Sequence, residues 1–216
     1  MSSVAALEKP KATAIVKEEI EETPVPATKR ERSASLDEEP VGKKLKSSSE
    51  VQGEKHEDGS VLFDLTSKKQ VSVRTWKNAV MVDIREYYYS NGEMKPTKKG
   101  ISLTKDQWKT VVSLADDIVK AVDWVQNPSK RALDYQAETL DDVETNSVAF
   151  SISSTRRATV RKFKSMILID FREYYDANGT MKPGQKGVSL KKEQWEMLHE
   201  RFDAIDAAME ELGQQD

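Results

Sequence analysis

The 216-residue sequence contains no cysteine. The absence of thiols excludes disulfides and zinc sites built on thiolates, and it is compatible with a reducing compartment. No stretch approaches the run of about 18 apolar residues that suggests a membrane-spanning helix. The first residues also lack the basic start and apolar core of a secretory signal. We therefore expect no membrane partner.

Aromatic residues are missing from residues 1–60, which carry four prolines and are rich in glutamate and serine. Such a segment buries too little apolar surface to offset the entropy that it would lose on folding. The composition predicts a disordered N-terminal arm. Within it, residues 29–46 hold two basic clusters separated by 12 residues. This spacing resembles a bipartite nuclear import signal and predicts that the protein is in the nucleus.

Signatures of catalysis are missing as well. The only histidines are His56, in the predicted arm, and His199. The sequence has no nucleophile elbow, phosphate loop or metal-ligand set, and its carboxylates are scattered or lie beside arginines. We expect a protein that is not an enzyme, with no catalytic residue, no metal site and no cofactor.

The sequence does contain a long internal repeat. The block Asp83–Trp108 recurs without a gap 87 residues later as Asp170–Trp195, with 17 of 26 positions identical. The repeat predicts two domains, residues 61–126 and 148–213, joined by a tether of residues 127–147 in which a short helix is an alternative. Domains of about 65 residues bury little surface and are marginal alone. We expect the two repeats to pack on each other or on a second chain.

Each repeat has the pattern of several strands followed by one helix, which predicts the α+β class. Residues 70–76 alternate between apolar and polar, residues 79–89 are too rich in β-branched and aromatic residues for a helix, and residues 98–103 form a further strand. Asn-Gly pairs in both repeats predict tight hairpin turns. A helix starts near Thr104 with a capping-box pattern, whereas Lys191 stands at that position in the second repeat.

Charge is segregated within each repeat. Residues 61–105 hold nine Lys/Arg against four Asp/Glu, whereas residues 106–126 hold two against four. In the second repeat, residues 148–192 hold ten against three and residues 193–216 hold one against eight. The strands are basic and the helices acidic. Because a helix must cover one sheet face to bury its apolar stripe, the basic face is left open to a polyanion. Lysines that only protect strand edges from aggregation are the alternative.

Aromatic residues stand among these cations. Arg74 and Trp76 share a strand face, as do Arg161 and Phe163. A ring on a solvated basic face can stack on unpaired bases while the cations hold phosphates. The alternative is that these two rings are core residues at a strand end. Of the adjacent tyrosines in each repeat, alternation does not say which are core, and for Asp83 we expect a buried ion pair.

The motif D-x-R-E-Y-(aromatic)…M-K-P-x-x-K-G-(I/V)-S-L…Q-W, present in both repeats, resembles the single-stranded-DNA-binding domain of the positive-cofactor-4 family of transcriptional coactivators. The resemblance implies that each repeat is a curved four-stranded antiparallel sheet with a C-terminal helix, and that the domains pair. It implies binding to single-stranded or melted DNA in transcription by RNA polymerase II, with the general transcription machinery and activators as partners.

The resemblance also assigns site residues. Stacking aromatics fall on Trp76 and Tyr88 and on Phe163 and Tyr175, and tyrosine replaces a usual tryptophan at the second position of each pair. The cationic contacts implied are Arg74, Lys77, Arg85, Lys95 and Lys99 in the first repeat and Arg161, Lys164, Arg172, Lys182 and Lys186 in the second.

Three questions stay open at the level of sequence. The two repeats pair within one chain, as an intramolecular pseudo-dimer, or two chains pair as a homodimer. The ligand is DNA or RNA, since stacking tolerates both sugars. A different class of function is a protein-interaction scaffold whose sheet docks acidic activators.

Overall fold

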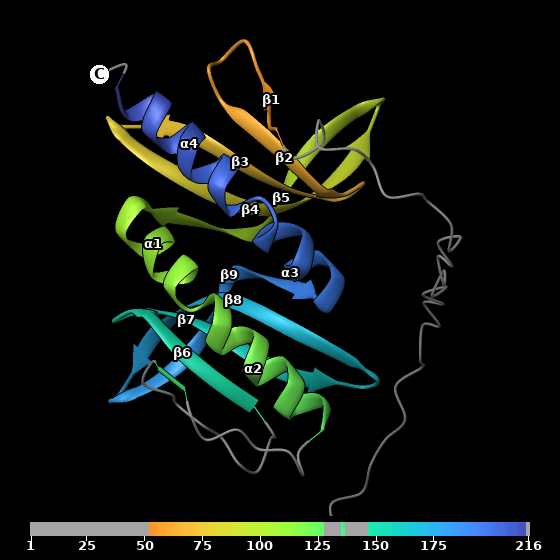
Figure 1. The fold of residues 1–216 in the computed structure, drawn as a ribbon, viewed down its shortest axis with the longest axis vertical. Coiled ribbons are helices and arrows are strands. Elements are labelled where there is room, and N and C mark those ends of the chain that lie inside the picture. The colour runs from red at the N-terminus through yellow and green to blue at the C-terminus, as the bar shows by residue number, and fades with distance from the viewer. Residues whose placement is uncertain (1–51, 128–134, 137–146, 215–216) are drawn as a thin grey trace, which may run out of the picture. The chain divides into compact units, whose positions relative to one another are not determined.

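The computed structural model describes residues 52–127, 135–136 and 147–214. The described residues belong to one compact unit (Figure 1). The predicted import signal, nearly all of the predicted arm and most of the predicted tether with its alternative helix lie outside the described residues.

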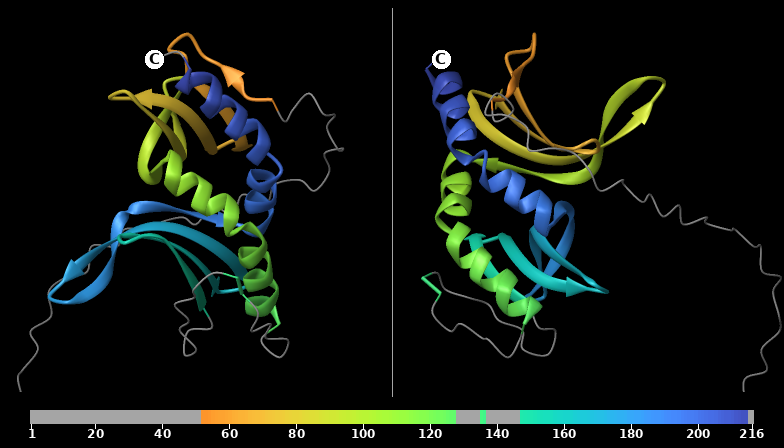
Figure 2. Two further views of the ribbon diagram at one scale, coloured as in Figure 1. Left: turned by 60° about the vertical axis from the view of Figure 1, so that its left-hand side comes forward. Right: turned by 45° about the vertical axis from the view of Figure 1, so that its right-hand side comes forward.

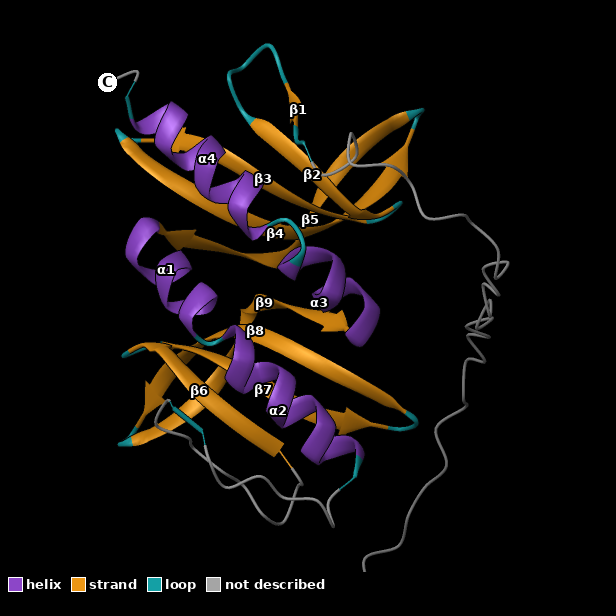
Figure 3. Cartoon of the chain, viewed as in Figure 1, coloured by secondary structure: helices purple, strands orange, loops and turns teal. Residues whose placement is uncertain are grey.

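Two antiparallel sheets make up the strand part of the fold, and each is followed by two helices (Figure 3). This architecture confirms the predicted α+β class. The first sheet has the order β1-β2-β3-β4-β5 and the second β6-β7-β8-β9. Their strands are β1 (Glu54–Lys55), β2 (Val61–Thr66), β3 (Lys69–Trp76), β4 (Ala79–Ser90) and β5 (Glu93–Thr104), and then β6 (Ser147–Ser153), β7 (Arg156–Phe163), β8 (Met166–Ala177) and β9 (Thr180–Lys191). The helices are α1 (Lys105–Ser113) and α2 (Ala115–Gln126), and then α3 (Lys192–His199) and α4 (Phe202–Gly213).

The structure differs from the sequence-based expectation in two places. Strand β1 pairs Glu54 with Leu62 and Lys55 with Val61, so ordered structure begins before residue 60. A strand of two charged residues carries no hydrophobic alternation, so the sequence does not reveal it. The single helix expected in each repeat is two helices, and the first break lies at Leu114, whose φ of −84° and ψ of −3° remain close to helical values. No glycine or proline marks this break.

The hairpin turns form as the sequence predicts. Asn91 and Gly92 both have positive φ, at 53° and 82°, and so do Asn178 and Gly179, at 57° and 81°. Positive φ at both central residues is the pattern of type I′ turns, whose twist matches that of the flanking strands.

The two helices of each repeat cover different sheets. Helix α1 packs on β4 and β5 of its own repeat and also contacts β6, as α3 contacts β2, whereas α2 packs on β6, β7 and β8 of the second repeat. Reciprocally, α3 packs on β8 and β9, whereas α4 packs on β3 and β4 of the first repeat. Figure 2 shows the sheets on opposite sides of the helices. The apolar residues of both sheets and all four helices form one continuous core.

Polar contacts link the repeats in the same reciprocal way. Lys69 Nζ donates to the carbonyl of Ser189 at 2.7 Å and to Gln194 Oε1 at 3.0 Å. At the equivalent position, 87 residues later, Arg156 Nη1 donates to the carbonyl of Ser102 at 2.7 Å and also to the side chain of Gln107. The two repeats are therefore related by an approximate twofold axis that passes between them.

Candidate nucleic-acid interface

The outer face of each sheet, away from the helices, carries the first of the two rings that the sequence singles out in each repeat. On β3, Val71 and Val73 are fully buried under the helices. The alternate residues of the same strand point outward, and the Trp76 side chain is 58% exposed. Phe163, at the equivalent place on β7, is 45% exposed. The interpretation of these two rings as core residues is therefore wrong.

Cations surround both rings. The guanidinium carbon of Arg74 lies 6.0 Å from the centroid of the Trp76 ring. In the second repeat, Arg161 Cζ and Lys164 Nζ lie 5.5 Å and 5.8 Å from the centroid of Phe163. Each repeat thus places a large exposed ring within cation–π range of positive charge, at the end of the strand that precedes the first turn.

The turn beside each ring holds a lysine in a costly backbone conformation. Lys77 has a φ of 50° and Lys164 a φ of 56°. For residues other than glycine the left-handed region costs about 1–2 kcal/mol, and such strain often accompanies a functional role. Glycine would remove the strain, yet both repeats keep a lysine whose charge extends from the tip of the turn.

The second predicted pair of rings, Tyr88 and Tyr175, is also exposed, at 49% and 53%. Each stands opposite a lysine on the neighbouring strand, Lys95 or Lys182. Tyr87 and Tyr174 are half-buried and Tyr89 is 66% exposed, so none of these tyrosines is a core residue. Burial raises the pKa of Tyr87, and Tyr174 lies against Arg157, with Cζ 4.5 Å from the ring centroid.

Arg85 is held by groups of its own chain. Its Nε and Nη2 donate to the two carboxylate oxygens of Asp83 at 2.8 Å and 2.7 Å, and Nη1 donates to the carbonyl of Thr97 at 2.8 Å. Asp83 is 2% exposed, so the expected buried ion pair is present. These hydrogen bonds raise the pKa of Arg85 further above its usual value. A Cβ at Gly100 would lie 2.7 Å from Arg85 Cζ, so the arginine needs glycine beside it.

The second repeat builds the same arrangement. Arg172 Nε and Nη2 donate to Asp170 at 2.8 Å and 2.9 Å, and Nη1 donates to the carbonyl of Gly184 at 3.0 Å. Arg85 and Arg172 were predicted to contact nucleic acid. Three of the five N–H donors of each guanidinium are used within the chain, where they brace the irregular pairing of β4 with β5 and of β8 with β9, and the contacts with nucleic acid remain predictions. Arg74 differs, since its Nη2 lies 4.0 Å from Asp83 and its side chain is 45% exposed.

The remaining predicted lysines are accessible. Lys99 and Lys186 are 71% and 74% exposed, and each lies 3.5 Å from a glutamate, Glu86 or Glu173. Lys95 is 42% exposed and lies 3.8 Å from Glu93. Exposed ion pairs of this kind contribute little to stability and are easily exchanged for a phosphate.

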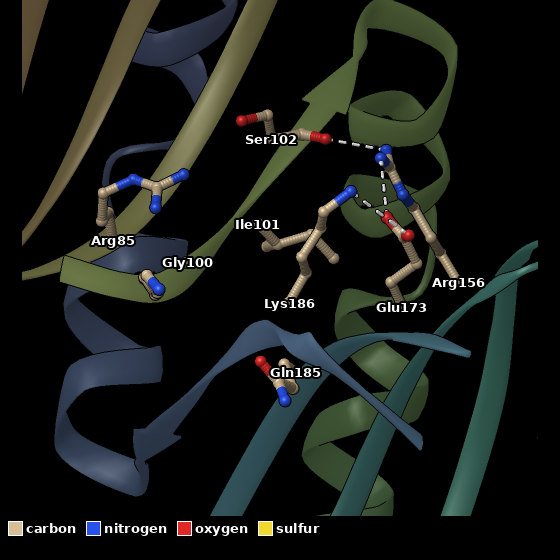
Figure 4. A pocket seen from close by; sticks show the side chains of 9 residues that line it. Arg85, Gly100, Ile101, Ser102, Arg156, Glu173, Gln185 and Lys186 are labelled. Atoms are coloured by element: carbon tan, nitrogen blue, oxygen red, sulfur yellow. Dashed lines mark hydrogen bonds and ion pairs between the residues drawn. The ribbon is translucent and has the colours of Figure 1, made fainter. Parts of the chain in front are cut away.

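Hollows adjoin these residues, and the sequence did not point to them. One of about 310 Å³ is lined by Arg74 and Trp76, and two are larger. One, of about 400 Å³, lies on the first outer face between Arg74 and Tyr87 and is closed on one side by His56 and Asp58 near β1. The other, of about 480 Å³, lies between the repeats (Figure 4). In it, Arg156 and Lys186 converge on Glu173. The hollows are formed by residues distant in sequence, so no local motif marks them.

Within the described ranges, no group of three His, Asp or Glu side chains is arranged to hold a metal ion. None of the described helices is long and apolar enough to cross a membrane.

Comparison with known proteins places this geometry in a family. The family profile "Transcriptional Coactivator p15 (PC4)" matches residues 63–114 and 150–201. An RNA polymerase II transcriptional coactivator of Drosophila melanogaster is 31% identical over 109 residues, which span 46% of this chain and 99% of that protein. The chain belongs to the PC4 family. The resemblance seen in the sequence is thereby confirmed. PC4 proteins are transcriptional coactivators, which supports the expectation that the chain is not an enzyme.

Other PC4 relatives match over shorter segments. The coactivator KIWI of Arabidopsis thaliana is 45% identical over 65 residues, 30% of this chain and 61% of that protein. The coactivator SUB1 of Saccharomyces cerevisiae is 60% identical over 47 residues, 21% of this chain and 16% of that protein. A solved MoSub1–ssDNA complex overlaps 38% of this chain and 95% of that chain at 28% identity, with a TM-score of 0.30 that carries no argument about shape.

The limits of the two PC4 matches coincide with the breaks between the helices. They end at residues 114 and 201, immediately before α2 and α4. Helices α2 and α4, which pack mainly on the sheet of the other repeat, therefore lie beyond the matched segments.

Proposed function

We propose that the protein binds single-stranded or melted DNA on the outer faces of its two sheets and acts as a coactivator of RNA polymerase II transcription in the nucleus. The observation that carries the proposal is the recurrence of an exposed ring among cations at equivalent places, Trp76 and Phe163. Stacking of a base on such a ring contributes about 1–3 kcal/mol.

The exposed residues proposed to contact DNA lie at both ends of the long strands. Trp76 adjoins the start of β4 and Tyr88 is near its other end, about 30 Å away along the strand at 3.3 Å per residue. In Figures 1 and 2 the β3–β4 turn lies on the same side of the compact unit as the β8–β9 hairpin. A nucleic-acid strand along that side meets Trp76 from one repeat and Tyr175 from the other.

The distribution of charge also favours nucleic-acid binding on the outer face of each sheet. The acidic helices lie on the inner faces, and the lysines of the turns and hairpins project from the strands. Because phosphate contacts release counterions, each phosphate contact adds about 0.7 to the slope of log K against log salt for a single strand.

Two alternatives fit parts of this surface. RNA offers the same bases and phosphates, so single-stranded RNA is the second candidate ligand. A scaffold for acidic activators would also use the basic face, but it would not need exposed rings. The transcription machinery and activators remain proposed partners, supported by the names of the PC4 relatives.

Intrinsic fluorescence tests the proposal directly. Of the four tryptophans, Trp76 is 58% exposed and the other three are at most 4% exposed. Titration with oligothymidine should quench Trp76, and duplex DNA of equal length should quench it less. The double variant Trp76→Phe/Phe163→Trp moves the reporter to the second repeat and asks whether that face binds too.

Binding measured by anisotropy of a labelled strand completes the test. Trp76→Ala/Phe163→Ala should weaken binding by roughly one and a half to four orders of magnitude, because each of the two stacked bases lost costs about 1–3 kcal/mol. Tyr89→Ala is the matched control, since Tyr89 is 66% exposed and is not among the proposed contacts. Unchanged affinity of the double alanine variant would refute the stacking role, and tighter binding of RNA than DNA would favour the alternative ligand.

A further inference from the structure

We propose that the two repeats have diverged into complementary halves, so that the first repeat pairs with the second repeat of the same chain and neither pairs with its own copy. The proposal concerns the inner surface between the repeats and does not rest on nucleic-acid binding. Three positions near the approximate twofold axis carry it, and at each the two repeats hold different residues.

The first position is occupied by Phe202 in α4 and by Ala115 in α2, which are equivalent by the 87-residue offset. The Phe202 ring contacts two equivalent tryptophans, Trp108 at 5.1 Å and Trp195 at 5.8 Å between centroids. A side chain that touches both members of a symmetric pair must lie close to the axis. Two phenylalanines there would claim the same space, and two alanines would leave a hole. Both Ala115 and Phe202 are buried, at 6% exposure.

The second position is occupied by Lys98 and Gln185, which are also equivalent. Both line the hollow between the repeats, where Arg156 and Lys186 already supply positive charge (Figure 4). Pairing two first repeats would place two copies of Lys98 in that hollow. The observed pairing replaces one of them by a neutral amide and so reduces like-charge repulsion.

The third position concerns the tryptophan N–H groups. Trp108 Nε1 donates to Asp206 Oδ1 at 2.7 Å. The equivalent acceptor for Trp195 would stand at residue 119, which is valine, and Trp195 Nε1 has no partner in the described part of the chain. A pair made of two copies of the first repeat would leave both indole N–H groups without an acceptor. Two second repeats would satisfy both indoles but would bring two copies of Phe202 together at the axis.

These differences oppose each like-with-like pair for a different reason. A pair of two first repeats would have a cavity at the axis, two copies of Lys98 in the hollow between the repeats, and two indole N–H groups without acceptors. The second repeat paired with itself is overpacked at the axis, which is destabilising in a close-packed core. Only the mixed pair fits, and covalent linkage gives its two halves a high effective concentration.

A size-swap cycle in the full-length chain tests the proposal. The variants are Ala115→Phe, Phe202→Ala and the double variant that exchanges the two residues. Each single change should lower the melting temperature, because one adds a second ring at the axis and the other removes the only one. The double variant should melt above both single variants. Simple additivity of the two losses would overturn the proposal, since it would show that the positions do not share one space.

Three further measurements keep the test independent of folding failures. Ala115→Leu with Phe202→Leu makes a milder exchange should Ala115→Phe not fold, with the same expected rescue. Light scattering of the wild type should give 24.4 kDa at every concentration, the mass of one chain. A mass that rises toward twice that value with concentration would overturn pairing within the chain. Gln185→Lys should lower the melting temperature most at low salt, and Lys98→Gln added to it should restore the wild-type value.

Discussion

Replacing Lys77 with glycine should make the protein more stable and a weaker binder of single strands. Lys77 holds a φ of 50° at the turn next to Trp76. Relief of the left-handed strain stabilises the native state by about 1–2 kcal/mol. The greater freedom of glycine in the unfolded chain costs about 0.5–1 kcal/mol. The net gain is therefore about 0.5–1 kcal/mol.

The same change removes one proposed phosphate contact. The slope of log K against log salt should fall by about 0.7 for Lys77→Gly and about twice that when Lys164→Gly is added. Stability is measured by urea unfolding, and binding by anisotropy of a labelled oligothymidine across about 50–200 mM salt.

Asn78 supplies the matched control within the same turn. It also has a left-handed φ, of 60°, but no charge. Asn78→Gly should leave the salt dependence unchanged, with a small effect on stability because asparagine tolerates this region. If Lys77→Gly destabilises the protein, the strain argument is wrong. If it leaves the salt slope as in the wild type, Lys77 does not contact the phosphate backbone.

Three further predictions concern differences between the repeats. Val119→Asp should give Trp195 Nε1 the acceptor that Asp206 gives Trp108 and should stabilise the protein by about 0.5–1.5 kcal/mol in urea unfolding, whereas Val119→Ala should not. Lys191→Thr should complete the capping box seen at Thr104, where the backbone N–H of Gln107 donates to the threonine hydroxyl at 3.4 Å. The change should stabilise the protein by about 0.5–2 kcal/mol, and an unchanged urea midpoint would contradict this prediction. Burial lowers the pKa of Lys69, so the unfolded state binds more protons between the two pKa values and stability should rise with pH through that alkaline window. Lys69→Arg introduces the residue found at the equivalent position 156 and should reduce the increase of the urea midpoint with pH. An equally steep increase in the variant would show that Lys69 does not cause it.

The repeat and its alternation were enough to predict strands over residues 70–76, 79–89 and 98–103 and the hairpin turns, whereas they did not reveal β1 and left the two rings open between an exposed and a core position. Val71 and Val73 alternate with Arg74 and Trp76, and local geometry alone decides which pair faces water. The pairing of helix with sheet was not predictable in this way. The apolar stripe of α2, with Ile118 and Val122, is the same whether it covers its own sheet or another one.

The role of Arg85 illustrates a second limit. Its sequence position, two residues after Asp83 on an alternating strand, predicts an arginine on the outer face, and it is there. Its third contact, with the carbonyl of Thr97, depends on the irregular register between Arg85 and Tyr87, where β5 contributes extra residues. No local pattern specifies that irregularity, so the sequence could not separate a bracing arginine from a free one.

The exchange of α2 and α4 has a consequence for how such a gene can change. Deletion of either copy would remove a helix that packs on the inner face of the surviving sheet, so we expect the loss of one copy to destabilise the other. A truncation within the second copy is therefore a defect of the first as well. The crossing helices therefore link the folding of each copy to the presence of the other, whatever each copy contributes to binding.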